Sequence, residues 1–232
     1  DENNFTTSLG REGSDYTAAI FAYALNAESV TIWKDVPGVL NGDPRVFENT
    51  VLLNQISYTE AIELAFYGAS VIHPKTLQPL QRKEIPLYVR SFLNPEGAGT
   101  SVSKGKTLEP HVPCYILKPK QVLIRLSSLD FSFMVEDNIS EVFALLYKSQ
   151  MRVDMIQNSA ISFSVCVNNK YNRLEELLQI LRSKFKVTVY EDVDLYTVRH
   201  FDSKALKSIE SRKDDILLEQ RAQETIQYVV KN

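Results

Sequence analysis

A glycine-containing turn near the start of the chain has the residue types of an anion-binding site. The stretch TTSLGREGSDYTAA places Arg11 between Gly10 and Gly13, directly before an alanine-rich run. The first N–H groups of a helix are unsatisfied and lie at the positive end of its dipole, so they attract anions. Arg11 would donate to a carboxylate or phosphate, and Asp15 would orient Mg²⁺, a substrate amine or a second catalytic group. The alternative is that Ser14 or Asp15 only caps the helix and pairs with Arg11.

A second candidate site is the stretch WKDVPGVLNGDPR, which leaves the end of an expected strand. Ligands of α/β sheets usually bind at such strand ends. Asp35 and Arg45 bracket a loop that contains Pro37 and Gly38, and Lys34 adds a positive charge. The alternative is that the stretch is only two turns between elements.

Other familiar chemical motifs are missing from the sequence. His73 precedes a proline and fits a structural side chain better than a metal ligand. The three histidines and two cysteines show no metal-site spacing, so we expect no metal held by protein ligands alone. None of the eight glycines forms a GxGxxG or GxxxxGK pattern, and there is no GxSxG motif.

The elements expected around these motifs alternate between helix and strand. Helical spacing of apolar residues predicts a helix over about 14–26, and the β-branched run SVTIWKD predicts a strand over 29–35. SYTE has the pattern of a capping box, Pro74 fits the first turn of a further helix, and IPLYVRS predicts a strand. This order predicts an α/β layer over residues 1–105.

The pattern changes after a segment rich in proline, glycine, serine and lysine, residues 94–113. We expect a domain boundary near residue 105 and a linker over 106–120. Residues 121–192 follow the order βαββαβ, which is ferredoxin-like, and 193–232 follow a shortened βαββ order. The paired strands recur at an offset of 63 residues, which predicts a degenerate repeat. The matched positions are Gln157 and Gln220, Phe163 and Ile226, Val165 and Tyr228, and Val167 and Val230.

The composition is that of an ordinary globular protein. Its net charge of -3 comes from interspersed acids and bases, so we expect no binding to nucleic acid or to an anionic membrane. Cys114 and Cys166 lie far apart among apolar residues, which fits reduced thiols in a cytoplasmic protein. No run reaches the roughly 20 apolar residues of a membrane span, and there is no signal peptide pattern. The opening DENNF lacks a methionine, so we expect a processed start or a piece of a longer protein.

Three ordered motifs resemble the C-terminal half of the aspartokinase catalytic domain, of the amino-acid-kinase superfamily. They are TSLGREGSDYTAA, IWKDVPGVLNGDPR and GASVIHPKTLQP. The βαββαβ unit and its shortened repeat resemble the paired ACT domains of that family. The resemblance implies a partial three-layer α/β domain followed by α+β ACT domains. It also implies transfer of the ATP γ-phosphoryl group to the β-carboxylate of L-aspartate, with Mg²⁺.

The resemblance also assigns residues to this reaction. Arg11, Ser14 and Asp15 would bind aspartate, with Arg11 and Asp15 organising the reacting groups. The nucleotide would contact Lys34, Asp35, Leu40, Arg45, Ser70 and Val71. Three residues depart from the usual family pattern: Glu12 adds a negative charge, Ser70 replaces a common lysine and Leu40 a frequent tyrosine. The Lys-Phe-Gly-Gly type motif of the family's N-terminal half is missing, so we expect no kinase activity from this chain alone.

ACT domains bind amino acids beside the loop after their first strand, which here is SSLDFSFMVEDNIS. We expect Asp130 to take the amino group of an effector, lysine or threonine, and N–H groups near Ile139 to take its carboxylate. The remaining effector candidates are Ser128, Phe131, Val153, Gln157, Asn158 and Ser159. Alternatively, Phe131, Phe133 and Met134 are core or dimer contacts. We expect a homodimer through the ACT domains, because the shortened unit needs a neighbouring strand. An alternative function is a free-standing amino-acid sensor with a vestigial kinase remnant.

Overall fold

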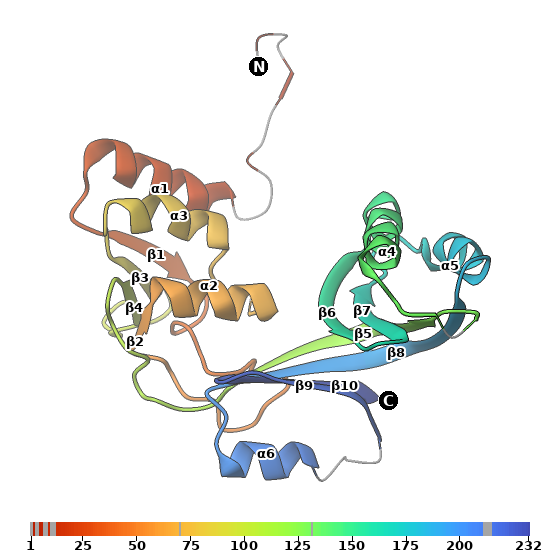
Figure 1. The fold of residues 1–232 in the computed structure, drawn as a ribbon. Coiled ribbons are helices and arrows are strands. Elements are labelled where there is room, and N and C mark those ends of the chain that lie inside the picture. Colours follow the sequence, from red (N-terminus) through yellow and green to blue (C-terminus); the bar gives the residue numbers. More distant parts are fainter. Residues whose placement is uncertain are drawn as a thin grey trace. The chain divides into compact units, whose positions relative to one another are not determined.

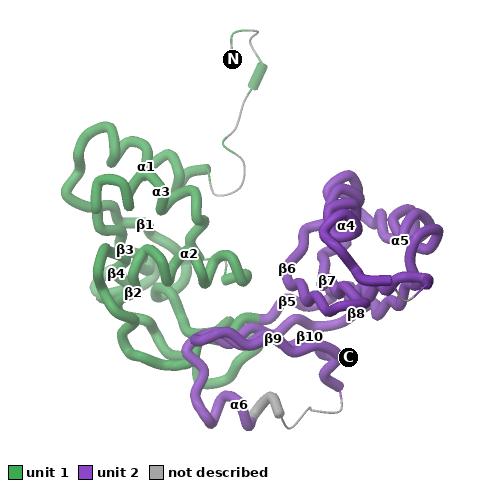
Figure 2. Tube along the Cα trace, in the orientation of Figure 1, with its two compact units in different colours: residues 1–116 green, residues 117–232 purple. Residues whose placement is uncertain are grey.

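The computed structural model describes residues 2, 5–6, 9, 13–69, 71–130, 132–210 and 215–232, with the backbone alone for 208–210. The chain forms two compact units, residues 1–116 and 117–232 (Figure 2). The division falls inside the segment that the sequence predicts as a linker. We describe each unit by itself.

The first unit is a four-stranded sheet with three helices (Figure 1). The strand order is β1-β3-β4-β2, in which only β3 and β4 are antiparallel neighbours. In chain order the elements are α1 (Gly13–Leu25), β1 (Val30–Lys34), β2 (Gln55–Ser57), α2 (Tyr58–Tyr67), α3 (Pro74–Arg82), β3 (Leu87–Ser91) and β4 (Thr100–Ser103). Strand β4 was not predicted: its TSVS sequence lies in the glycine- and serine-rich segment, yet Thr100 and Val102 are buried in the sheet.

The starts of α2 and α3 follow the patterns seen in the sequence. Ser57 caps α2, because its hydroxyl accepts from the N–H of Glu60 at 3.0 Å. His73 caps α3 through Nδ1, which accepts from the N–H of Lys75 at 3.1 Å, and Pro74 occupies the first turn. The prediction that His73 is a structural side chain is confirmed.

The second unit is a six-stranded sheet with the order β6-β7-β5-β8-β10-β9. Its elements are β5 (Cys114–Ser127, which begins in the first unit), α4 (Glu136–Lys148), β6 (Arg152–Asn158), β7 (Ser162–Asn168), α5 (Leu174–Arg182), β8 (Lys186–Arg199), α6 (Ser203–Glu210), β9 (Ile216–Arg221) and β10 (Thr225–Lys231). One face of β5 and β7 packs against α4 and α5, with Ile124, Val165 and Leu177 fully buried.

A single strand, β8, replaces two predicted strands, KVTVYE and LYTVRHF. The polar residues between them resemble a turn, but Asp192 takes a left-handed conformation (φ 54°) and the strand continues through it. Because β8 pairs with β10 and also neighbours β5, it serves both halves of the repeat. The strand that the shortened half needs therefore comes from the same chain.

The predicted repeat is confirmed residue by residue. The pairs of β6 with β7 recur between β9 and β10 at the offset of 63, including a bulge at Asp154 in one hairpin and Leu217 in the other. The pairs of β5 with β7 recur between β8 and β10, with an offset of 72 in the first strand. At that offset Asp192 matches Lys120, which is also left-handed (φ 56°).

The sheet of the second unit curls until its two edge strands approach each other. Gln157 on β6 donates through Nε2 to the carbonyl of Glu219 on β9 at 3.5 Å. The enclosed face holds a core built from matched residues of the two repeats. These pairs are Leu123 and Leu195, Met155 and Leu218, and Cys166 and Val229. Each repeat therefore supplies half of the same core.

Candidate functional site

The structure brings together Asp15, which the resemblance assigns to the aspartate site, and Lys34, which it assigns to the nucleotide site. Lys34 ends β1, and its Nζ lies 2.8 Å from Oδ2 of Asp15 in the first turn of α1. The two side chains are 21% and 12% exposed, so this ion pair is largely shielded from water. A carboxylate and an ammonium group thus meet where a strand ends and a helix begins, the predicted place for an anionic ligand.

The helix α1 begins earlier than the sequence suggests. Its first residue is Gly13, so the predicted cap residues Ser14 and Asp15 lie inside the first turn. The hydroxyl of Ser14 points to Oδ1 of Asp15 at 3.5 Å, while Thr17 donates to the carbonyl of Gly13 at 2.7 Å. Asp15 uses its other oxygen for Lys34, because the strand end lies beside this turn.

Arg45 belongs to a different ion pair, on the loop after β1. Its Nε and Nη2 reach the two carboxylate oxygens of Asp43 at 3.0 and 2.7 Å. The side-chain hydrogen bond from Arg45 lowers the pKa of Asp43 below its ordinary value, and Asp43 raises the pKa of Arg45. The Arg45 side chain is 85% exposed, so its guanidinium is open to a ligand.

Asn41 fixes the loop that carries these residues, a role that the residue pattern did not predict. Its Nδ2 donates to the carbonyl of Pro113 at 2.9 Å, and its Oδ1 accepts from the N–H of Val51 at 2.7 Å. Leu40 lies in an antiparallel bridge with Leu52. Asp35 directly follows β1 and is exposed. An asparagine in a loop rich in turn residues is expected to form part of a turn. Its contacts with distant residues can therefore be seen only in the structure.

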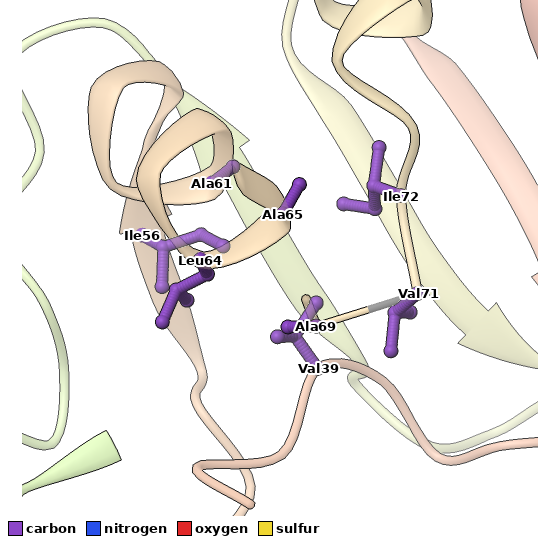
Figure 3. A pocket seen from close by; sticks show the side chains of 8 residues that line it. All are labelled: Val39, Ile56, Ala61, Leu64, Ala65, Ala69, Val71 and Ile72. Atoms are coloured by element: carbon purple, nitrogen blue, oxygen red, sulfur yellow. The ribbon is translucent and has the colours of Figure 1, made fainter. Parts of the chain in front are cut away.

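A small, open apolar pocket lies between the two predicted nucleotide segments (Figure 3). Val39 lines it from the loop after β1, next to Leu40, and Val71 lines it from the segment before α3. The other lining residues are Ile56, Ala61, Leu64, Ala65, Ala69 and Ile72. The pocket is therefore bordered by one predicted nucleotide contact, Val71, and by the neighbour of another.

Three predicted site residues lie outside the described residues: Arg11, Ser70 and Phe131. Glu12 does so too. Their roles stay predictions. Among the described residues, no group of three or more His, Cys, Asp or Glu side chains is placed to hold a metal ion. In the same part of the chain, no helix has the length and apolar character needed to cross a membrane.

The predicted effector loop is held by its own hydroxyl and carboxylate groups. Ser128 donates through its hydroxyl to the carbonyl of Ser132 at 2.7 Å, and the N–H of Ser132 donates to Asp130 at 3.1 Å. Hydrogen bonds from the Ser132 side chain and backbone lower the pKa of Asp130, so it carries a negative charge at neutral pH.

This loop meets the turn between β6 and β7. The N–H of Met134 donates to the carbonyl of Ala160 at 2.9 Å, and the hydroxyls of Ser159 and Ser162 lie 2.7 Å apart. The structure therefore brings Ser128, Asp130 and Ser159 to one end of the sheet.

The remaining effector candidates have different surroundings. Gln157 and Asn158 are exposed on the edge strand β6. Val153 pairs with Val167 and packs against the core. Ile139 also packs against the core, and its N–H donates to the carbonyl of Val135, so it is not available for a carboxylate. The helix begins three residues earlier, at Glu136.

Comparison with known proteins identifies the family. The model of the amino acid kinase family matches residues 1–91. Lysine-sensitive aspartokinase 3 of Escherichia coli (strain K12) is 40% identical over 163 residues, which are 70% of this chain and 36% of the relative. The chloroplastic aspartokinase 1 of Arabidopsis thaliana is 31% identical over 174 residues, 75% of this chain and 30% of the relative.

Solved aspartokinases share the fold. The structure of E. coli aspartokinase III in complex with lysine and aspartate (T-state) matches with a TM-score of 0.77 and 31% identity, over 97% of this chain and 53% of that one. The Clostridium acetobutylicum aspartate kinase matches with a TM-score of 0.81 over 97% of this chain and 56% of that one, at 18% identity, which shows the fold alone.

Residues 1–91 therefore belong to the amino acid kinase family. Within it, the chain belongs to the aspartokinases, with a kinase portion followed by ferredoxin-like ACT regulatory domains. The chain spans about a third of the length of the two curated relatives and about half of the solved chains.

Proposed function

We propose that this chain is part of an aspartokinase that transfers the γ-phosphoryl group of ATP to the β-carboxylate of L-aspartate. The observation that carries the proposal is the Asp15–Lys34 pair, at a strand end beside a helix start. The relatives add support, since E. coli aspartokinase III has been solved with aspartate and ADP. We propose that the protein to which this chain belongs binds aspartate and a nucleotide as well.

The proposed roles follow from charge. Phosphoryl transfer depends mainly on positioning and on neutralising the phosphate oxygens, which requires cations. Lys34 and Arg45 are the described cations of this site, and both are already held by carboxylates, Asp15 and Asp43. An arriving phosphate would compete for these cations, while Arg11 and Ser14 would bind the aspartate substrate and the freed Asp15 would orient it.

Mg²⁺ fits the residues present. In proteins it is bound by one or two carboxylates together with substrate phosphates. Asp35 is exposed next to Lys34 and offers such a carboxylate beside the proposed phosphate position. When bound, the ion would neutralise charge on the transferred group.

We propose that the base of the nucleotide lies against the lining of the small apolar pocket. Ligand pockets are lined mainly by apolar groups, and a planar base buries its faces against such a lining. Val39 and Val71 border this pocket from the two predicted nucleotide segments. Leu40, the neighbour of Val39, would then lie close to the adenine of ATP.

The second unit would confer feedback control. We propose that an end-product amino acid, lysine or threonine, binds beside the effector loop of a cytoplasmic homodimer and shifts a two-state equilibrium of the enzyme. The E. coli relative is described as lysine-sensitive, which supports an amino acid of this class.

Replacing Lys34 in the full-length protein tests the catalytic assignment. We expect Lys34→Met to lower kcat/KM about 100-fold or more, the usual effect of losing one charge-stabilising donor. Lys104→Met is the matched control, because Lys104 also pairs with a carboxylate, Glu84, but on an exposed surface of the same unit. Equal aspartyl phosphate formation by Lys34→Met and by the control would contradict the proposal. The 232-residue chain alone should form none.

A further inference from the structure

The loop that follows β1, residues 35–53, folds back on itself as a short antiparallel pair. We call it the nucleotide loop, because it carries the predicted nucleotide contacts Asp35, Leu40 and Arg45. At the centre of the pair, Leu40 bridges to Leu52. The residues on either side of such a bridge normally exchange two backbone hydrogen bonds with the residues opposite them. The position of the loop therefore depends on whether those bonds stay within the pair.

Asn41 links this pair to the start of β5. Its N–H donates to the carbonyl of Val51 at 3.0 Å, as the pairing requires. The return bond is different, because the N–H of Val51 donates to Oδ1 of the Asn41 side chain at 2.7 Å. The carbonyl of Asn41 instead accepts from the N–H of Tyr115 at 2.6 Å, and Nδ2 donates to the carbonyl of Pro113 at 2.9 Å. The side chain of Asn41 thus replaces its own carbonyl within the loop, so that the carbonyl can bond to another strand.

This exchange depends on the carboxamide group of Asn41. It needs an acceptor and a donor on one short side chain, and a carboxamide supplies both. Asn41 is only 8% exposed, so the groups that it satisfies are shielded from water. Its backbone N–H, its carbonyl and both polar atoms of its side chain each have a partner in the protein. Asn41 therefore acts on a ligand through its neighbours in the loop.

A side chain also completes the pair on the other side of Leu40. The N–H of Leu53 donates to the carbonyl of Val39 at 2.9 Å. The N–H of Val39 does not return this bond but donates to Oγ1 of Thr100 at 2.8 Å. Thr100 is fully buried in β4. The nucleotide loop is thus held to the sheet at Val39 and to β5 at Asn41.

The first residues of β5 are firmly packed. Cys114 and Ile116 are buried in the core of the first unit. The ring of Tyr115, between them, lies 5.5 Å from the ring of Phe47 in the nucleotide loop. From there β5 continues to Ser127, in the second unit. The nucleotide loop therefore takes its position from the strand that the two units share.

We propose that Asn41 is a positioning residue for ATP: by bonding to Pro113 and Tyr115, it holds the nucleotide loop in the conformation that binds the nucleotide. The inference rests on the proposed function, because it takes this loop to bind ATP. Leu40 directly precedes Asn41, and Arg45 follows it by four residues, so both predicted contacts move with the loop. When the binding conformation is populated only part of the time, the apparent affinity falls by that fraction.

Kinetics of Asn41→Ala in the full-length protein test the inference. If the released loop is in the binding conformation about a fifth of the time, the KM for ATP and the dissociation constant for ADP rise about fivefold. Saturating ATP holds the loop in place, so kcat should stay within about twofold of the parent. The KM for aspartate should be unchanged, because its predicted site is at α1. A variant that is only less stable would lose active protein, which lowers the apparent kcat and leaves both KM values as they are.

Asn41→Asp separates the bond to β5 from the bond within the loop. The carboxylate keeps an acceptor for the N–H of Val51, but it places an oxygen where Nδ2 donates to the carbonyl of Pro113. At about pH 8, where the carboxylate is ionised, the KM for ATP should rise about as much as in Asn41→Ala. If Asn41→Asp instead has the KM of the parent, the bond to Pro113 plays no part and the inference is wrong.

Tyr58→Phe is the matched control. It removes a buried hydrogen bond of the same unit, from the hydroxyl of Tyr58 to the carbonyl of Ile85 at 2.5 Å, and should leave both KM values unchanged. An equal rise in the KM for ATP in this control would contradict the inference, since the effect would not be specific to Asn41.

Melting curves identify the folded variants, and Asn41→Asp decides the question should Asn41→Ala fail to fold. An unchanged KM for ATP in the folded Asn41 variants would overturn the inference alone. A parent that neither forms aspartyl phosphate nor binds ADP would overturn the proposed function and the inference together.

Discussion

Lys34 and Asp15 are joined by an ion pair of 2.8 Å although 19 residues separate them in the sequence. The pair ties the first turn of α1 to the end of β1 and leaves its charges close to the surface. We expect either Lys34→Met or Asp15→Asn to destabilise the first unit by about 1–3 kcal/mol, because each leaves a shielded charge without this partner. The double variant should lose less than the sum of the two, as measured by urea denaturation. If the double variant instead loses the sum of the two single losses, the ion pair contributes nothing to the free energy of unfolding.

Gly99 has no space for a side chain. Its φ is 69°, and an added Cβ would overlap the carbonyl oxygen of Val89. We expect Gly99→Ala to cost at least about 3 kcal/mol, since backbone strain and overpacking add. Gly105 is the matched control: its φ is 68°, yet nothing lies within 4 Å of an added Cβ. Gly105→Ala should cost only about 1 kcal/mol. Equal decreases in melting temperature for the two variants would contradict the predicted overlap with Val89.

Lys118 and Asp154 form a buried ion pair of 2.7 Å, with Arg152 at 3.4 Å from the same carboxylate. The repeat places Tyr190 and Leu217 at the equivalent positions, which shows that the fold does not need charges there. We expect Asp154→Leu alone to cost about 2–4 kcal/mol, because it removes the carboxylate from two cations. Lys118→Met together with Asp154→Leu should recover most of that loss in chemical denaturation. A double variant as unstable as the single one would contradict this view.

Burial raises the pKa of Cys166 to about 12, from an ordinary value of 9.0. The folded protein therefore keeps this thiol protonated at a pH where the unfolded chain has lost the proton. The raised pKa therefore contributes fully to the free energy of unfolding below pH 9. Above pH 9 this contribution falls by about 1.4 kcal/mol per pH unit, until the pKa of the folded protein is reached.

Cys166→Val isolates this effect, since the matching residue of the repeat is Val229. The variant should be within about 1 kcal/mol of the parent at pH 7. Between pH 7 and pH 10 it should lose less stability than the parent, because it has no thiol to ionise. Equal losses in urea denaturation at pH 10 would contradict the raised pKa.

Periodicity predicted most of the second unit because its strands and helices alternate cleanly. The repeat was readable from apolar residues such as Val165 and Tyr228, which hold equivalent places in the two hairpins. The continuity of β8 was not predictable, since the polar residues around Asp192 have the composition of a turn, and only the structure shows that the strand continues through them. Short strands such as β4 lack enough residues to show a period.

The candidate sites were also predictable only in part. Local signals indicated the glycine turn, the strand-end loop and the predicted effector loop as candidates, because glycine, proline and capping residues are recognisable in sequence. Which side chains meet was not predictable. Lys34 meets Asp15 instead of standing free, Arg45 meets Asp43, and Asn41 reaches Pro113. Each of these contacts depends on how distant or neighbouring segments fold back, which no residue pattern along the chain encodes.

The shared strand β8 has a consequence for how the second unit gains its structure. A chain cut at Asp192 would divide β8, so that β5 and β10 would each face only part of the strand that lies between them. The matched residues of the enclosed core would also be separated, Leu123 from Leu195 and Cys166 from Val229. We therefore expect that neither repeat folds by itself and that the two repeats unfold together in one cooperative transition.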